Sequence, residues 1–190
     1  MSYLKISEFF SNQITKDLDY DEEKKEIITY SIEMIFLQAF GFVLIVALAS
    51  LFNALLPAAI AAIFGAFLRK LSGGAHFDSA TKCLVFGAVI YTVVGVGAKN
   101  LINISFWNNN VNLLLIFISF LIVGILAPVD SKAKPIRSIS FKRKLKISSL
   151  VFIAVSLLII IVIDSLLLRT SIALGIAYQS LTLLPIFNKE

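Results

Sequence analysis

Charged residues are scarce in this chain: Asp, Glu, Lys and Arg make up only 15% of its 190 residues, whereas 58% are hydrophobic. A water-soluble domain carries roughly 25% charged residues, so a water-soluble fold is excluded. The charges also stay outside the long apolar runs. Because the strands of a membrane barrel would alternate apolar and polar residues, the pattern predicts an all-α integral membrane protein.

Cysteine and histidine are scarcer still, with one of each. A single cysteine excludes an internal disulfide framework and leaves a free thiol to explain. One histidine, one cysteine and a nearby aspartate supply few zinc ligands, and the chain has no HExxH motif. A serine peptidase pairing Ser72 or Ser79 with His76 would want a GxSxG turn, which is missing. We therefore expect no metal and no other cofactor.

Six apolar stretches predict about six transmembrane helices. They are Met34–Phe52, Ala54–Leu68, Cys83–Ala98, Val111–Val129, Ile147–Ile163 and Thr170–Phe187. Before them, apolar residues recur every three or four positions from Tyr3 to Ile14. This spacing predicts an amphipathic helix in the membrane interface, with packing against other protein as the alternative. We expect two regions: an interfacial N-terminal segment, residues 1–33, and a six-span membrane domain, residues 34–190.

The second and third apolar stretches are short. They have 15 and 16 residues, whereas a full span needs about 20. Since they flank the polar stretch Arg69–Cys83, we expect part of that stretch to continue both helices. Small residues recur every four or eight positions on these two spans, which favours close packing between them. They are Ala58, Ala62 and Ala66 on the second span, and Gly87 and Gly95 on the third.

Positive charge is distributed unequally between the two sides that six spans would define. Both termini and the loops 69–82 and 130–146 carry 15 of the 17 Lys and Arg residues, and only Lys99 and Arg169 lie on the other side. The positive-inside rule therefore predicts that the charge-rich side is cytoplasmic, where a thiol stays reduced. Topology and contact with membrane lipid account for the net charge of +5, so we expect no nucleic-acid partner.

The stretch Arg69–Cys83 holds the sole histidine and the sole cysteine, seven residues apart. A cysteine peptidase needs such a pair, with the thiolate as nucleophile and the imidazole as base. On an unbroken helix His76 and Cys83 would be separated by a rise of about 10.5 Å, too far for a hydrogen bond. A dyad therefore requires the chain to fold back, and Gly73-Gly74 supplies backbone freedom for this. Otherwise Cys83 is a small apolar residue and His76 an ordinary polar one.

Three cations surround this cysteine in sequence. Arg69, Lys70 and Lys82 would favour the thiolate electrostatically, as would placing Cys83 at a helix N-terminus. Backbone N–H groups at such a helix start could also hold an oxyanion. Asp78 either orients His76 or is a solvated loop charge.

The stretch RKLSGGAHFDSATKC resembles the R-[RK]-x-[ST]-G-G-x-H…C signature of the accessory gene regulator B (AgrB) family, membrane peptidases of Gram-positive quorum sensing. APVDSKAKPI, Ala127 to Ile136, resembles the family's AP-x(6)-P-I stretch. The resemblance implies a bacterial cell-membrane endopeptidase that removes the C-terminal tail of an accessory gene regulator D-type propeptide. The substrate stays attached as a thioester, and its own cysteine or serine then closes a thiolactone or lactone ring.

The same resemblance implies roles for individual residues. Cys83 matches the nucleophile and His76 the base, and Arg69, Gly73 and Gly74 also match the signature. The propeptide's tail is typically acidic in this family. A cationic stretch including Lys132, Lys134 and Arg137 is a candidate docking surface for that tail, although topology and lipid contact would also produce such a run.

A small transporter or peptide exporter without peptidase chemistry is the alternative. It would place charged groups within the spans, but Gln38 and Gln179 are the clearest polar residues there. Faces of small residues make a homodimer a reasonable expectation.

Overall fold

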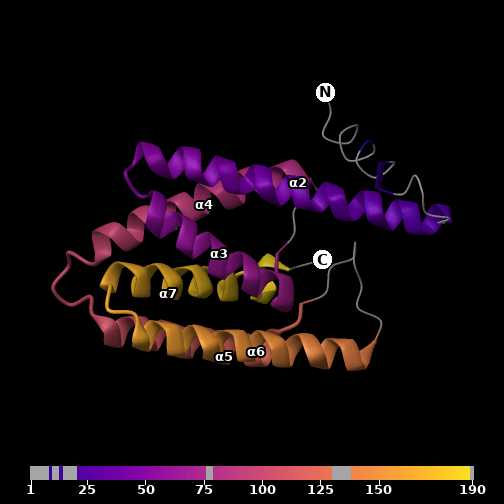
Figure 1. Ribbon diagram of the computed structural model, residues 1–190. Helices are drawn as coiled ribbons and strands as arrows, with labels where there is room; N and C mark the ends of the chain where they lie inside the picture. The colour runs from indigo at the N-terminus through magenta and orange to yellow at the C-terminus, as the bar shows by residue number, and fades with distance from the viewer. Residues whose placement is uncertain (1–8, 10–12, 15–20, 76–78, 130–137, 189–190) are drawn as a thin grey trace.

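The computed structural model describes residues 9, 13–14, 21–75, 79–129 and 138–188. Within these residues the chain forms α-helices and a short 3₁₀ helix but no strand, as predicted (Figure 1). The elements are α2 (Glu22–Leu51), α3 (Leu55–Ser72), α4 (Ala80–Leu101), α5 (Asn109–Leu126), α6 (Ile139–Val162), α7 (Leu166–Leu181) and η1 (Pro185–Phe187). The interfacial helix predicted over Tyr3–Ile14 lies almost wholly outside the described residues.

The helices α2 to α6 are each long and apolar enough to cross a membrane. Helix α7 is apolar but has only 16 residues, about 24 Å of helix against a hydrocarbon core of about 30 Å. Each of the six predicted apolar stretches overlaps one of these helices. The chain is therefore an all-α membrane protein with five long apolar helices and a shorter sixth.

Two helices begin well before their apolar stretches. Helix α2 begins at Glu22, so the charged residues before Met34 form a helix that leads into the apolar run, and it is unbroken through residues 33 and 34, where the two predicted regions meet. Its start is fixed by Asp21, whose carboxylate accepts a 2.9 Å hydrogen bond from the Lys24 amide. Helix α6 begins at Ile139 rather than near Ile147, after the N-cap Ser138. An apolar run marks the part of a helix inside the bilayer, whereas a cap marks where the helix begins.

The helices run alternately up and down. The end of α3, the start of α4, the end of α5, the start of α6 and the end of α7 consequently gather at one end of the bundle (Figure 1). We call this the site end. As predicted, the polar stretch continues both short spans, because α3 runs on to Ser72 and α4 already begins at Ala80.

Helix α3 is central: it packs against α2, α4, α6 and, most extensively, α7. A Cβ on Gly175 of α7 would lie 2.4 Å from the Ala61 carbonyl oxygen of α3, and one on Gly95 of α4 would lie 2.5 Å from the Ala58 Cβ. The main chains thus approach closely at both contacts, as small residues permit. The predicted close contact of α3 and α4 holds at Gly95 but is wrong at Gly87, where a Cβ would meet nothing within 4 Å.

Two apolar cores lie on either side of α3. One is shared with α5, α6 and α7 and includes Leu68, Ile116 and Ile176. The other is shared with α2 and α4 and includes Ile45 and Tyr91. Large apolar side chains also cover the outside, for example Ile125, which is 76% exposed. Such a surface suits lipid rather than water.

Candidate active site

Cys83 lies in the first turn of α4 and is partly buried. Its amide donates a 3.0 Å hydrogen bond to the Ser79 carbonyl oxygen, while the Ser79 side chain makes no capping hydrogen bond. The first amides of α4 therefore point out of the helix beside the thiol, at the positive end of the helix dipole. Since α3 ends at Ser72 and α4 begins at Ala80, no helix runs through both residue 76 and Cys83.

His76 and Asp78 lie outside the described residues. The His76–Cys83 dyad and the orienting role of Asp78 therefore stay predictions. The described residues on either side of them, up to Ala75 and from Ser79 onward, define the frame that any dyad must fit.

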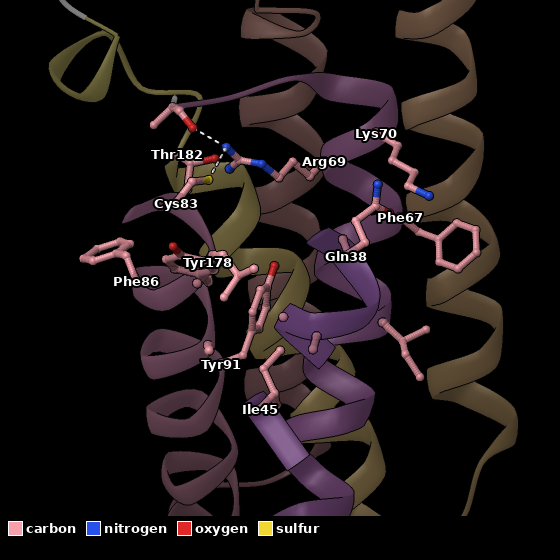
Figure 2. Close-up of a pocket in the computed structure, with 18 of the residues that line it drawn as sticks. Gln38, Ile45, Phe67, Arg69, Lys70, Cys83, Phe86, Tyr91, Tyr178 and Thr182 are labelled. Carbon is pink, nitrogen blue, oxygen red and sulfur yellow. Dashed lines mark hydrogen bonds between the residues drawn. The ribbon is translucent and has the colours of Figure 1, made fainter. Parts of the chain in front are cut away.

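Arg69, in the last turn of α3, joins the two halves of this frame. Its Nη2 atom lies 3.9 Å from the Cys83 Sγ atom and also donates a hydrogen bond to the Ala75 carbonyl oxygen (Figure 2). This contact places a positive charge and an N–H donor against the sulfur. Lys70 and Lys82, the other two cations of the stretch, are exposed. Arg69 is thus the cation that the fold holds directly against the thiol.

The main chain at Gly73 and Gly74 takes conformations that favour glycine, with φ of +72° and +136°. Space is also lacking there. A Cβ on Gly73 would lie 2.2 Å from the Val129 carbonyl oxygen, and one on Gly74 would lie 2.6 Å from the Thr182 Oγ1 atom. The Gly-Gly pair therefore does more than supply flexibility. Because it has no side chains, two segments that are distant in sequence can contact the loop that follows α3.

The residues that form hydrogen bonds with this loop come from the end of α7 and from the segment after α5. Gln179 is fully buried, and its Nε2 atom donates a 2.8 Å hydrogen bond to the Gly73 carbonyl oxygen. The Ala75 amide donates to the Thr182 carbonyl oxygen at 3.2 Å, and the Val129 amide donates to the Ser72 carbonyl oxygen at 2.9 Å. In the sequence, Gln179 stands out only as a polar residue within a span. Its position in an apolar run was the available signal, since a buried amide needs a partner.

An apolar cavity of about 860 Å³ opens beside Cys83. It lies between α2, α3, α4 and the end of α7, and Arg69 lines it close to the thiol. Farther from the thiol its wall includes the rings of Tyr91 and Tyr178, which meet edge to face with centroids 5.4 Å apart (Figure 2). A cavity of this size is typical of a small-molecule or peptide side-chain site.

The predicted docking residues Lys132, Lys134 and Arg137 lie outside the described residues. Four further cations of the same stretch lie on the first turns of α6, at the site end of the bundle. They are Lys142, Arg143, Lys144 and Lys146. Among the described residues, no three His, Cys, Asp or Glu side chains form a group that could hold a metal ion.

The fold and the site together define a multi-pass helical membrane protein with a thiol held against a guanidinium at the mouth of an apolar cavity. The chain belongs to the AgrB family: the family model for accessory gene regulator B matches residues 7–183. It is 32% identical to an AgrB-like protein of Clostridium perfringens strain SM101, over 96% of this chain and 92% of that protein. A second AgrB-like protein, from C. perfringens strain 13, has the same identity and coverage.

A more distant relative, an AgrB-like protein of Clostridium acetobutylicum, is 23% identical over 97% of this chain and 87% of that protein. No solved structure matches this chain significantly. Family membership gives the chain the accessory gene regulator role in quorum sensing.

Proposed function

We propose that this protein is a cysteine endopeptidase that cuts the C-terminal tail from an accessory gene regulator D-type propeptide and promotes cyclisation of the remainder. The observation that carries the proposal is the Arg69 guanidinium 3.9 Å from the Cys83 thiol, at the start of a helix in a chain of the AgrB family. The guanidinium and the positive end of the helix dipole both lie where negative charge develops when the sulfur attacks a carbonyl carbon.

In the proposed first half-reaction, His76 takes the proton of the Cys83 thiol, and the thiolate attacks the carbonyl carbon of the scissile peptide bond. The negative charge that develops on the carbonyl oxygen meets the outward-facing amides of the first turn of α4. Collapse of this intermediate breaks the C–N bond. The imidazolium gives its proton to the leaving amine, so the acidic tail departs and the rest of the propeptide is a thioester on Sγ.

In the second half-reaction, a cysteine or serine of the propeptide attacks the thioester carbonyl and gives its proton to His76. The C–S bond to Cys83 breaks as the ring closes, and the imidazolium returns its proton to Sγ. The internal nucleophile must outcompete water at this step. A cavity with a mostly apolar wall supports this outcome, because such a wall offers water few hydrogen-bond partners next to the thioester.

The substrate would approach from the cytoplasm. The positive-inside rule supports this orientation, with both termini and the site end cytoplasmic. There the cations of the stretch 130–146 would attract the acidic tail, with Lys132, Lys134 and Arg137 as the docking residues. Exchanging Lys132 and Lys134 for Glu should lower processing and leave membrane insertion unchanged. Undiminished processing by that variant would remove the docking surface from the proposal.

The exporter alternative receives no support from the polar groups within the spans. The buried amide of Gln179 is hydrogen-bonded to Gly73 and holds the loop, so it is used structurally. Gln38 lines the cavity next to the thiol.

Co-expression with the cognate propeptide tests the proposal. The variants are Cys83→Ala, Cys83→Ser and His76→Ala, and the readout is release of the tail, followed by mass spectrometry. We expect cleavage by the unaltered protein and none by Cys83→Ala or His76→Ala, at equal levels of protein in the membrane. Full processing by Cys83→Ala would overturn the peptidase mechanism.

A further inference from the structure

The cavity beside Cys83 extends far along α4. Its lining residues on that helix include Cys83, Gly87 and Tyr91, which recur every four positions and therefore share one face. Tyr91 lies eight residues beyond Cys83, a rise of about 12 Å along the helix axis. A group bonded to the thiol consequently has a deep space next to it on the membrane side.

The wall of this space has an apolar part and a cationic part. Apolar side chains from three further helices line it, including Phe42 and Ile45 of α2, Ile63 and Phe67 of α3, and Leu181 of α7. Arg69 and Lys70 are the charged residues among its lining, and both come from the last turn of α3, at the site end of the cavity, which we call its mouth. The cavity thus has an apolar interior and a cationic mouth (Figure 2).

We propose that this cavity binds the apolar side chains of the propeptide residues that precede the scissile bond, and that its shape decides which residues are accepted there. This inference rests on the proposed function. After attack, the acyl part of the substrate is bonded to Sγ and must lie against the cavity wall. The acidic tail on the other side of the bond is excluded from an apolar interior by the cost of desolvating its carboxylates. The cations at the mouth attract it instead.

Gly87 offers a way to fill the cavity without disturbing the fold. It lines the cavity, and a Cβ built on it would meet nothing within 4 Å. Gly87→Leu therefore places a branched side chain in empty space. Gly97 is the matched control, because it lies on the same helix, is equally open and does not line the cavity. Ala66→Leu is a second cavity-filling variant, from α3.

A chemical probe tests the cavity without any substrate. Cys83 is the sole cysteine, so labelling reports on this one thiol. Its thiolate attacks the thiosulfonate sulfur of a methanethiosulfonate reagent, which forms a mixed disulfide and expels methanesulfinate. We expect Gly87→Leu to slow the benzyl reagent about tenfold relative to Gly97→Leu, and the methyl reagent by less than about twofold, as steric filling of a pocket implies. Equal benzyl rates in the two variants would overturn the proposal.

Processing gives the second readout, with two propeptides that carry either a large apolar residue or alanine immediately before the scissile bond. Gly87→Leu and Ala66→Leu should cleave the first propeptide much less than Gly97→Leu does, and the alanine propeptide about as well. If the cavity holds a lipid chain instead, Gly87→Leu and Gly97→Leu will process both propeptides alike. That result would overturn this inference but leave the proposed peptidase function unaffected. Processing by Cys83→Ala would instead overturn the proposed function.

Discussion

The side-chain amide of Gln179 donates a 2.8 Å hydrogen bond to the main-chain carbonyl oxygen of Gly73, across 106 residues of sequence. One α7 residue thereby holds the loop that leaves α3. Three residues farther along, the Thr182 carbonyl oxygen accepts from the Ala75 amide, and the Ala75 carbonyl oxygen accepts from Arg69. The end of α7 is thus connected through Ala75 and Arg69 to the Cys83 thiol.

Removing the amide of Gln179 should loosen this connection. Gln179→Leu removes the 2.8 Å hydrogen bond to the Gly73 carbonyl oxygen, which lowers the free energy of unfolding by about 1 kcal/mol. That loss corresponds to a fall in melting temperature of roughly 2–4 °C for a chain of this length. Thermal unfolding in detergent measures the fall, and we expect processing of the propeptide to drop as well. Gln38→Leu makes the same change on α2, so an equal loss of stability in both variants would contradict the anchoring role.

Alanine should not be tolerated at Gly73 or Gly74. Both residues have positive φ, and each added Cβ would collide with an oxygen atom of Val129 or Thr182. Relief of the collision must shift the loop, and a displacement of about 1 Å near the reacting groups can cost about a hundredfold in rate. We expect Gly73→Ala to lower processing at least about tenfold. Gly97→Ala, at an open position on α4, should process normally; normal processing by Gly73→Ala as well would contradict the described loop.

Arg69 should control the reactivity of Cys83. Arg69→Gln removes the positive charge 3.9 Å from Sγ, where negative charge develops as the sulfur reacts, so alkylation by iodoacetamide should slow about tenfold. Arg69→Lys keeps the charge but cannot reproduce the planar fork that reaches both Ala75 and Cys83. The alkylation rate of Arg69→Lys should lie between those of the unaltered protein and Arg69→Gln. Lys82→Gln, which removes an exposed cation of α4, is the control. If Arg69→Gln and Lys82→Gln have the same rate, the contact between Arg69 and Cys83 has no electrostatic role.

Gly95 should be required for the packing of α3 against α4. A Cβ there would lie 2.5 Å from the Ala58 Cβ and 2.6 Å from the Ala58 main chain. Relief of this contact must separate the two helices, and overpacking of this kind costs about 1–3 kcal/mol. Gly95→Ala should therefore lower the melting temperature in detergent, whereas Gly97→Ala should leave it nearly unchanged. Equal melting temperatures would show that α3 and α4 are not in main-chain contact.

The membrane helices could be predicted from the sequence because the apolar runs are long and the charges avoid them. The ends of these helices could not be read from apolarity alone: Asp21 and Ser138 start α2 and α6 several residues outside the bilayer run. Within the site, a dyad of residues 76 and 83 would require a break in the helix; α3 and α4 are separate helices, and the dyad itself stays a prediction.

The contacts between distant segments were beyond the reach of sequence patterns. Whether Gln179 meets Gly73 depends on how α7 is rotated against α3, which is set by the contact of Gly175 with Ala61. Gly87 is the opposite case, a predicted helix contact that does not form. Its spacing from Gly95 suggested a second helix contact, but the neighbouring helices leave it facing the cavity. A small residue permits a close approach, and only the packing of the whole bundle decides whether the approach occurs.

Isolation of the acyl-enzyme tests the central claim most directly. The purified protein is incubated briefly with the propeptide, quenched in acid and examined by mass spectrometry before and after hydroxylamine treatment. The account predicts an adduct on the Cys83 peptide whose mass equals the propeptide without its tail, removed by hydroxylamine and absent from Cys83→Ala. Release of the tail with no adduct on Cys83, at the same rate in Cys83→Ala, would contradict it.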